Sequence, residues 1–293
     1  MDRNVNPPAN WPGRLRLALG YLLFAAAVVY ALRRSPDSLA SLQWGWLVAA
    51  AGVMVAMLVL QMAQVVVFLR CHAVRNGRYW PLMFAVKKGI LNSVLPARTG
   101  TLVLMYMLTR YYPVTWRQYL TFGIVAAVVS LAVSAVALAW LLTPPVAFIG
   151  GVSALVGGVY LMRRFPVVPY ARALPQILLI GFGLYGTMLL AFWCILRAMG
   201  VQIGLRDASY FAVALNILSQ LSITPGNMGV RELLMGAVAP YLTLSAATGI
   251  LAGGIFHVIR TVVYAVCLGS LEVLALRYPT LKPKALEDSA PGA

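Results

Sequence analysis

The sequence predicts an all-α protein that crosses a membrane several times. Of its 293 residues, 61% are hydrophobic and only 10% are charged, and the mean hydropathy is +0.85. Soluble domains are about 45–50% apolar and about 25% charged, so a single core surrounded by water could not bury this excess. Six long apolar segments and two interrupted ones predict six transmembrane helices and two re-entrant helical hairpins, arranged as two inverted repeats.

The six long segments follow the chain from one end to the other. A spanning helix needs about 20 mostly apolar residues, and six segments meet this requirement: 15–32, 45–69, 118–142, 146–162, 174–196 and 245–271. The first could be mistaken for a cleavable signal, because Val29-Tyr30-Ala31 resembles a cleavage site. Arg33 and Arg34 follow at once and favour a retained anchor.

Two further apolar stretches are broken by proline and glycine. Residues 80–110 are interrupted by PARTG at 96–100, and residues 208–241 by PGNMG at 225–229. Each break leaves two arms that are shorter than a spanning helix. Proline removes a backbone donor and disfavours helix in the residue before it. We therefore expect two re-entrant hairpins whose open turns are covered by protein or face a watery cavity.

The two breaks also indicate an internal repeat. Both have the pattern Pro-x-x-x-Gly, and Pro96 and Pro225 are separated by 129 residues. The same offset aligns the three spans of residues 1–143 with the three spans of residues 144–276. Because each copy holds an odd number of spans, the second copy is inverted, as in many alternating-access transporters. Residues 277–293 form a short inner tail.

Positive charge sets the predicted orientation. If the N-terminus is inside, most Lys and Arg residues near the span ends lie inside, and the outer ends hold only Arg33, Arg34, Arg197 and Arg206. Loops on the cytoplasmic side carry such an excess. We expect an integral protein of the bacterial inner (plasma) membrane with both termini in the cytoplasm, the loop 110–117 inside and the loop 143–145 outside.

The charge balance excludes several kinds of chemistry. There are 23 Lys and Arg residues against 7 Asp and Glu residues, and no carboxylate occurs between Asp37 and Asp207. Hydrolysis by paired carboxylates and two-metal catalysis both need acids, and the three cysteines and two histidines have no metal-like spacing. We expect no enzyme activity, catalytic residue, metal or cofactor. Nucleic-acid binding is not expected either, because no soluble basic domain is present to carry it.

Ionisable groups inside the spans and hairpins are the candidate site. Burying charge in a membrane is costly, so such groups are functional candidates. The predicted substrate-binding residues are Lys87, Lys88, Arg98, Thr99, Asn227, Arg231, Glu232 and Arg260. Arg98 and Arg231 lie beside open turns whose free N–H groups, together with a guanidinium, suit a phosphate.

Structural roles are the alternative for the same residues. Lys87 and Lys88 could extend to the inner headgroups. Arg231 and Glu232 could belong to a structural ion-pair network. Adjacent side chains on a helix diverge, so a pair between Glu232 and Arg260 is better placed than a pair between Arg231 and Glu232.

The two breaks resemble a known family. LNSVLPARTG at 91–100 and ITPGNMGVRE at 223–232 resemble the two signatures of the lysylphosphatidylglycerol synthase transmembrane-region family, whose patterns read PGRxGE and PGGxGxRE. Ala97 and Thr101 depart from the first pattern. The resemblance implies a stand-alone, flippase-like member that moves lipids or lipid-linked sugars. It also implies no lipid aminoacylation, because the synthase domain is missing.

The functional hypotheses follow from the site and the resemblance. The leading one is a lipid translocase that moves a phospholipid or a polyprenyl-phosphate-linked lipid, with the phosphate headgroup at Arg98 and Arg231 and with Glu232 as a candidate proton carrier. A non-transporting membrane partner of a lipid-modifying enzyme or glycosyltransferase is the alternative. A membrane enzyme that uses Arg231, Glu232 and His257 is a third, disfavoured because an acid beside two arginines stays ionised.

Overall fold

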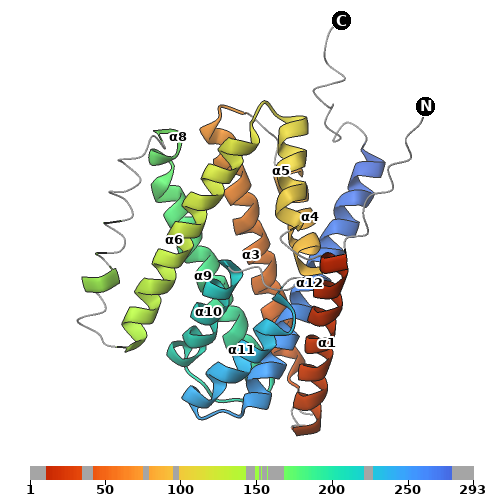
Figure 1. Ribbon diagram of the computed structural model, residues 1–293, viewed down its shortest axis with the longest axis vertical. Coiled ribbons are helices and arrows are strands. Elements are labelled where there is room, and N and C mark those ends of the chain that lie inside the picture. The colour runs from red at the N-terminus through yellow and green to blue at the C-terminus, as the bar shows by residue number, and fades with distance from the viewer. Residues whose placement is uncertain are drawn as a thin grey trace, which may run out of the picture.

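The protein is a bundle of helices (Figure 1). The computed structural model describes residues 11–34, 42–74, 79–94, 99–142, 149–151, 153, 157, 168–220 and 227–278, with no account of the side chains of residues 11–20, 94, 168 and 169. Within these ranges every regular element is a helix, and no strand occurs. The all-α prediction is therefore confirmed for the described part of the chain.

Four helices are long and apolar enough to cross a membrane. They are α3 (Trp44–Cys71), α6 (Trp116–Leu142), α9 (Leu174–Ala198) and α12 (Ala246–Arg277). They coincide with the spans predicted at 45–69, 118–142, 174–196 and 245–271. The span predicted at 15–32 lies within α1 (Trp11–Arg34), and most of the span predicted at 146–162 lies outside the described residues. A one-turn helix, α8 (Val168–Ala171), precedes α9.

Two pairs of shorter helices occupy the interrupted stretches. The first pair is α4 (Tyr79–Val94) and α5 (Thr99–Tyr111). The second is α10 (Leu205–Gln220) and α11 (Val230–Val238), which continues into the 3-10 helix η2 (Ala239–Leu242). The longest of these has 16 residues, fewer than the 20 or so that a span needs. In Figure 1 the first pair lies in the upper half and the second in the lower half.

The helix contacts occur in matching sets. α3 and α9 pack on each other at the centre; α3 also contacts α4 and α12, and α9 also contacts α10 and α6. α4 packs on α12 as α10 packs on α6, and α5 contacts α6 as α11 contacts α12. Each of these contacts has a counterpart when α3–α6 are exchanged for α9–α12, whereas the contact between α9 and α12 has no equally extensive counterpart between α3 and α6. α1 packs on α12 and α11.

Aromatic stacking joins α9, α10 and α12. The ring of Phe192 on α9 lies between Phe256 on α12, at 4.9 Å between centroids, and Phe211 on α10, at 5.6 Å. Offset stacks of this kind add to the free energy gained by burying the rings. These contacts connect two spanning helices to the second helix pair.

Small residues bring α11 directly onto α12. A Cβ atom added at Gly249 would lie 2.2 Å from the backbone oxygen of Met235, and one at Gly236 would lie 2.8 Å from Ile250. Glycines at such contacts are typical of closely packed membrane helices. Gly229, which precedes α11, has φ +77° and lies against Leu23 of α1. The start of α11 is therefore enclosed by both terminal helices.

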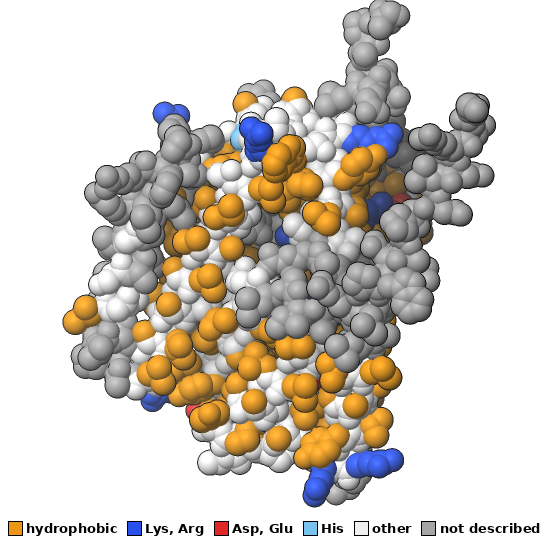
Figure 2. All heavy atoms as spheres, viewed as in Figure 1, with side chains coloured by type: hydrophobic (Ala, Val, Ile, Leu, Met, Phe, Trp, Pro, Cys, Tyr) orange, Lys and Arg blue, Asp and Glu red, His pale blue; other side chains and the backbone are white. Residues whose placement is uncertain are grey.

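The outer surface of the bundle is apolar. Large hydrophobic side chains such as Ile124, Leu179 and Val266 are more than 60% exposed, and Figure 2 shows such residues spread across the visible face between the basic ends. Soluble proteins rarely expose a patch of this extent. Together with the four long apolar helices, this surface indicates an integral membrane protein.

Candidate functional site

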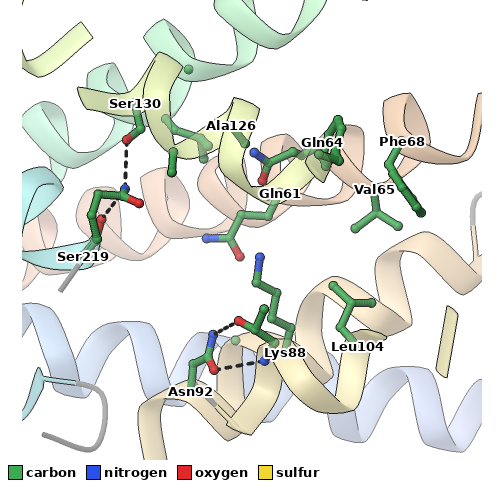
Figure 3. Close-up of a pocket in the computed structure, with 18 of the residues that line it drawn as sticks. Gln61, Gln64, Val65, Phe68, Lys88, Asn92, Leu104, Ala126, Ser130 and Ser219 are labelled. Atoms are coloured by element: carbon green, nitrogen blue, oxygen red, sulfur yellow. Dashed lines mark hydrogen bonds between the residues drawn. The ribbon is translucent and has the colours of Figure 1, made fainter. Parts of the chain in front are cut away.

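A cavity of about 480 Å³ lies among α3, α4, α5, α6, α9, α10 and α12. Volumes of about 300–1,000 Å³ are usual for ligand sites. Much of the lining comes from polar side chains, part of which Figure 3 shows. Two are cationic, Lys88 and Arg260, and the uncharged ones are Gln61, Gln64, Asn92, Thr101, Tyr119, Ser130, Asn216, Ser219, Gln220, Asn227 and Tyr264.

The arms of the first helix pair supply one wall of the cavity. Lys88 and Asn92 lie one turn apart on α4, so they share a face of the helix. The Asn92 Oδ1 accepts a hydrogen bond from the backbone N–H of Thr101 at 3.3 Å, and Nδ2 donates to its hydroxyl at 3.4 Å. These bonds join α4 to α5. In Figure 3 the Lys88 side chain extends across the cavity toward Gln61 of α3.

Arg260 brings a second cation from α12. Its Nη2 donates to the Ser93 hydroxyl at 3.1 Å, and that hydroxyl donates to the backbone oxygen of Gly89 at 2.9 Å. The Arg260 Nε is buried and has no hydrogen-bond partner among the described residues. One turn further on, the Tyr264 hydroxyl donates to Gln61 at 3.1 Å. Arg260 therefore keeps one unused donor in a side chain that lines the cavity. A buried N–H without an acceptor is costly, so a ligand oxygen that reached it would be favoured.

Uncharged polar groups of α6 and α10 form the opposite wall. The Ser130 hydroxyl donates to the Asn216 Oδ1 at 2.8 Å, and the Asn216 Nδ2 donates to the Ser134 hydroxyl at 2.8 Å. Gln220 donates to the Ser130 hydroxyl at 3.2 Å. Amides and hydroxyls both donate and accept, so this wall suits ligands that carry hydroxyl groups.

The cavity continues to the outer surface of α6. Leu120, Gly123 and Ile124 all line it, and all three are exposed, Ile124 to 65%. These residues belong to the apolar surface of a helix long enough to span. A polar interior therefore adjoins a surface suited to lipid.

A separate buried cluster contains Arg231, Glu232 and His257, which are 1%, 0% and 7% exposed. The Arg231 Nε donates to the Glu232 Oε1 at 3.3 Å, and Arg231 Nη2 lies 2.9 Å from the His257 Nδ1. Glu232 Oε2 accepts from the backbone N–H of Gly229 at 2.7 Å. Both carboxylate oxygens are therefore engaged within the protein.

This cluster corrects the expected ion pair. Glu232 pairs with its neighbour Arg231 and not with Arg260, which bonds to Ser93 instead. The expectation was wrong because Glu232 stands at the third position of α11 and turns back to cap the N-terminus of that helix. Folded back in this way, the carboxylate lies within reach of the adjacent guanidinium.

The predicted site residues are only partly brought together. Lys88, Asn227 and Arg260 line the cavity, whereas Arg231 and Glu232 lie in the buried cluster. Thr99 begins α5 and is not among the described lining residues. Lys87 pairs with Glu272 of α12 at 2.8 Å. Arg98 lies outside the described residues.

Sequence reasoning missed most of the uncharged lining. Gln61 and Gln64 are spaced three residues apart on α3, and Asn216 and Gln220 four apart on α10, so each pair lies on one helical face. Polar residues at this spacing within an apolar segment are a usable signal, because each needs a hydrogen-bond partner in the membrane. Apart from Thr99 and Asn227, the sequence-based prediction considered only charged residues.

A polar contact at one end of α3 also joins two segments. His72 Nε2 lies 2.9 Å from the Tyr170 hydroxyl, which itself donates to the backbone oxygen of Gln118 at 2.8 Å. Burial lowers the pKa of His72.

Within the described part of the chain, no group of three or more His, Cys, Asp and Glu residues is placed to hold a metal ion.

Comparison of the chain with protein-family models, with curated proteins and with solved structures finds no match.

Proposed function

We propose that this protein is a flippase-like lipid translocase, which moves a phospholipid or a polyprenyl-phosphate-linked lipid between leaflets. The observation that carries the proposal is the cavity with Lys88 and Arg260, whose polar interior reaches exposed apolar residues of α6. A charged headgroup does not cross hydrocarbon unaided, because removing it from water is costly. The headgroup would enter the cavity while the acyl chains stay in the bilayer beside α6.

The arrangement of the helices supports this proposal. We propose that α4–α5 and α10–α11 are re-entrant hairpins that enter from opposite sides of the membrane, as their places in the two halves of Figure 1 suggest. The matching contacts of α3–α6 and α9–α12 support two inverted repeats. Transporters built in this way carry their substrate site between the repeats near the middle of the membrane, and the cavity lies among helices of both.

The resemblance of the two Pro-x-x-x-Gly segments to the lysylphosphatidylglycerol synthase transmembrane-region family supports the same proposal. Asn227 and Arg231 belong to the second signature, and Asn227 lines the cavity. In this view Arg231 and Glu232 hold the end of the hairpin in place from within the protein, and the headgroup contacts fall to Lys88 and Arg260.

A reconstitution experiment tests the proposal. Purified protein is placed in liposomes that contain a trace of phospholipid with a fluorescent headgroup label, and a membrane-impermeant reductant is added outside. Without translocation, only label in the outer leaflet is lost. We expect loss of inner-leaflet label in the presence of the protein. If every lipid tested stays in its leaflet, the chain does not translocate these lipids, and the non-transporting partner becomes the better hypothesis.

The proposed orientation has its own test. We propose a bacterial inner-membrane location with both termini and the loop 110–117 in the cytoplasm and the loop 143–145 outside. Single cysteines introduced into a variant without Cys71, Cys194 and Cys267 should react with an impermeant thiol reagent accordingly. Termini found on opposite faces would contradict the inverted-repeat proposal.

A further inference from the structure

The described lining of the cavity contains two cationic side chains, Lys88 and Arg260, and no carboxylate. The sequence itself has no Asp or Glu between Asp37 and Asp207, and only Glu232 between Asp207 and Glu272. Asp207 accepts a hydrogen bond from the Gly204 N–H at the start of α10, and Glu232 lies in the buried cluster.

The two cations lie on helices in direct contact. A Cβ atom added at Gly89, the residue after Lys88, would lie 2.0 Å from the ring of Tyr264, one turn beyond Arg260 on α12. The bond from Arg260 to Ser93 joins the same two helices one turn further along α4. Lys88 and Arg260 therefore approach the cavity from adjoining walls.

We propose, on the basis of the function proposed above, that the cavity selects phospholipids with a net negative headgroup whose remaining part is uncharged and hydroxyl-bearing, and that it rejects headgroups with an ammonium group. The phosphate binds between Lys88 and Arg260. The hydroxyl-bearing part lies along the amide and hydroxyl wall of Ser130, Asn216 and Gln220.

The attraction for phosphate follows from the unused donor. A guanidinium binds phosphate oxygens through charge-assisted hydrogen bonds, which are stronger than neutral ones. Arg260 lines the cavity and its buried Nε has no hydrogen-bond partner among the described residues, so a small rotation of the guanidinium toward a bound phosphate would satisfy a donor that the protein leaves unsatisfied. Lys88 adds a second positive charge in the same cavity.

The rejection of ammonium groups follows from the missing acid. An ammonium group taken out of water needs a carboxylate or a comparable partner. Here it would find amides and hydroxyls, and it would be repelled by Lys88 and Arg260. Repulsion of an ammonium group by these two cations lowers the affinity for one kind of headgroup relative to another, and this difference in affinity is the selectivity. Phosphatidylglycerol and phosphatidylethanolamine differ in this respect, because only the second carries an ammonium group.

The experiment compares these two lipids in one sample. Full-length protein in detergent is mixed with equal amounts of phosphatidylglycerol and phosphatidylethanolamine that have the same acyl chains, and native mass spectrometry gives the ratio of the bound lipids. We expect the wild type to favour phosphatidylglycerol. Lys88→Gln and Arg260→Gln should each lower this ratio by about tenfold, the loss of one charge-assisted contact. Lys87→Gln is the matched control and should leave the ratio unchanged, because Lys87 bonds to Glu272 instead of lining the cavity.

A third test variant keeps the proposal testable if Lys88→Gln and Arg260→Gln fold poorly. Asn92→Asp has nearly the same shape, and its carboxylate can still accept from the Thr101 N–H. It places a negative charge one turn from Lys88, so the ratio should fall toward one or below while the melting temperature stays near that of the wild type.

The outcomes distinguish the two proposals. A wild type that binds both lipids equally or prefers phosphatidylethanolamine overturns this inference, as does a preference that neither Lys88→Gln, Arg260→Gln nor Asn92→Asp changes. If the preference and its loss are found but no lipid crosses the liposome membrane, the headgroup site stands and the translocase fails. Equal binding together with efficient movement of both lipids gives the reverse result.

Discussion

A single bulky side chain placed where the cavity meets the exposed surface of α6 should slow translocation strongly without unfolding the protein. Gly123 lies within α6, lines the cavity and is exposed, and a Cβ atom added there would meet nothing within 4 Å. Gly123→Trp therefore places an indole ring where the polar interior meets the lipid-facing surface. A helical glycine costs about 1 kcal/mol relative to alanine, so the replacement also removes an unfavourable residue from α6.

The size of the effect follows from the cavity volume. A cavity of about 150 Å³ accommodates benzene, and an indole ring is larger, so the introduced ring would take roughly a third or more of the 480 Å³. We expect translocation to slow by at least about tenfold, equivalent to about 1.4 kcal/mol in the barrier. The fluorescence assay in liposomes measures the rate.

The control adds the same ring elsewhere on the membrane surface. Gly52 on α3 is also exposed, has open space around an added Cβ and does not line the cavity. Gly52→Trp should translocate lipid at the wild-type rate. If Gly123→Trp is as active as Gly52→Trp, and both melt like the wild type, then lipid headgroups do not pass this end of the cavity and the proposed route is wrong.

Three further outcomes can be measured on purified protein by thermal melting in detergent. Gly249→Ala should lower stability by about 1–3 kcal/mol, because its Cβ would lie 2.2 Å from a backbone oxygen of α11, whereas Gly269→Ala on the same helix, with open space at its Cβ, should not; equal melting temperatures would contradict this packing. Glu232→Gln should cost about 3–5 kcal/mol, because it leaves the charge of Arg231 buried without its partner, and a near-neutral effect would mean that the pair is not buried as described. Burial lowers the pKa of His72 below its ordinary 6.5, so the folded protein resists protonation and should lose stability as pH falls below 6.5; His72→Gln should remove part of this dependence, and an unchanged profile would exclude His72 as its source.

The spans were predictable because apolar length alone determines them. α3, α6, α9 and α12 stand where continuous hydrophobic segments occur, since a helix that satisfies its own backbone is the simplest structure in lipid. The orientation of individual charged side chains was harder to predict from the sequence. Lys87 and Lys88 are neighbours in the chain but point to different faces of α4, and only the packing of α4 between α12 and α5 determines which lysine reaches Glu272 and which reaches the cavity.

The error at Glu232 also has a physical origin. The expectation disfavoured a pair between Arg231 and Glu232 because adjacent side chains on a helix diverge, but it did not consider that Glu232 lies in the first turn of a helix that begins at Val230 and has Gly229 as its cap. Glu at the third helical position commonly bonds back to the N–H of the cap residue. The glycine at 229 followed by Glu232 was therefore a usable signal for the role of this carboxylate.

The position of α1 has a consequence for how the protein is made. α1 leaves the ribosome before α11 and α12, the helices on which it packs. Until Gly229 and α12 have been synthesised, Leu23 of α1 lacks the contact with Gly229 that it makes in the folded bundle. Packing of α1 into the bundle therefore waits for α12, and a nascent chain that stops before α12 leaves α1 without these contacts.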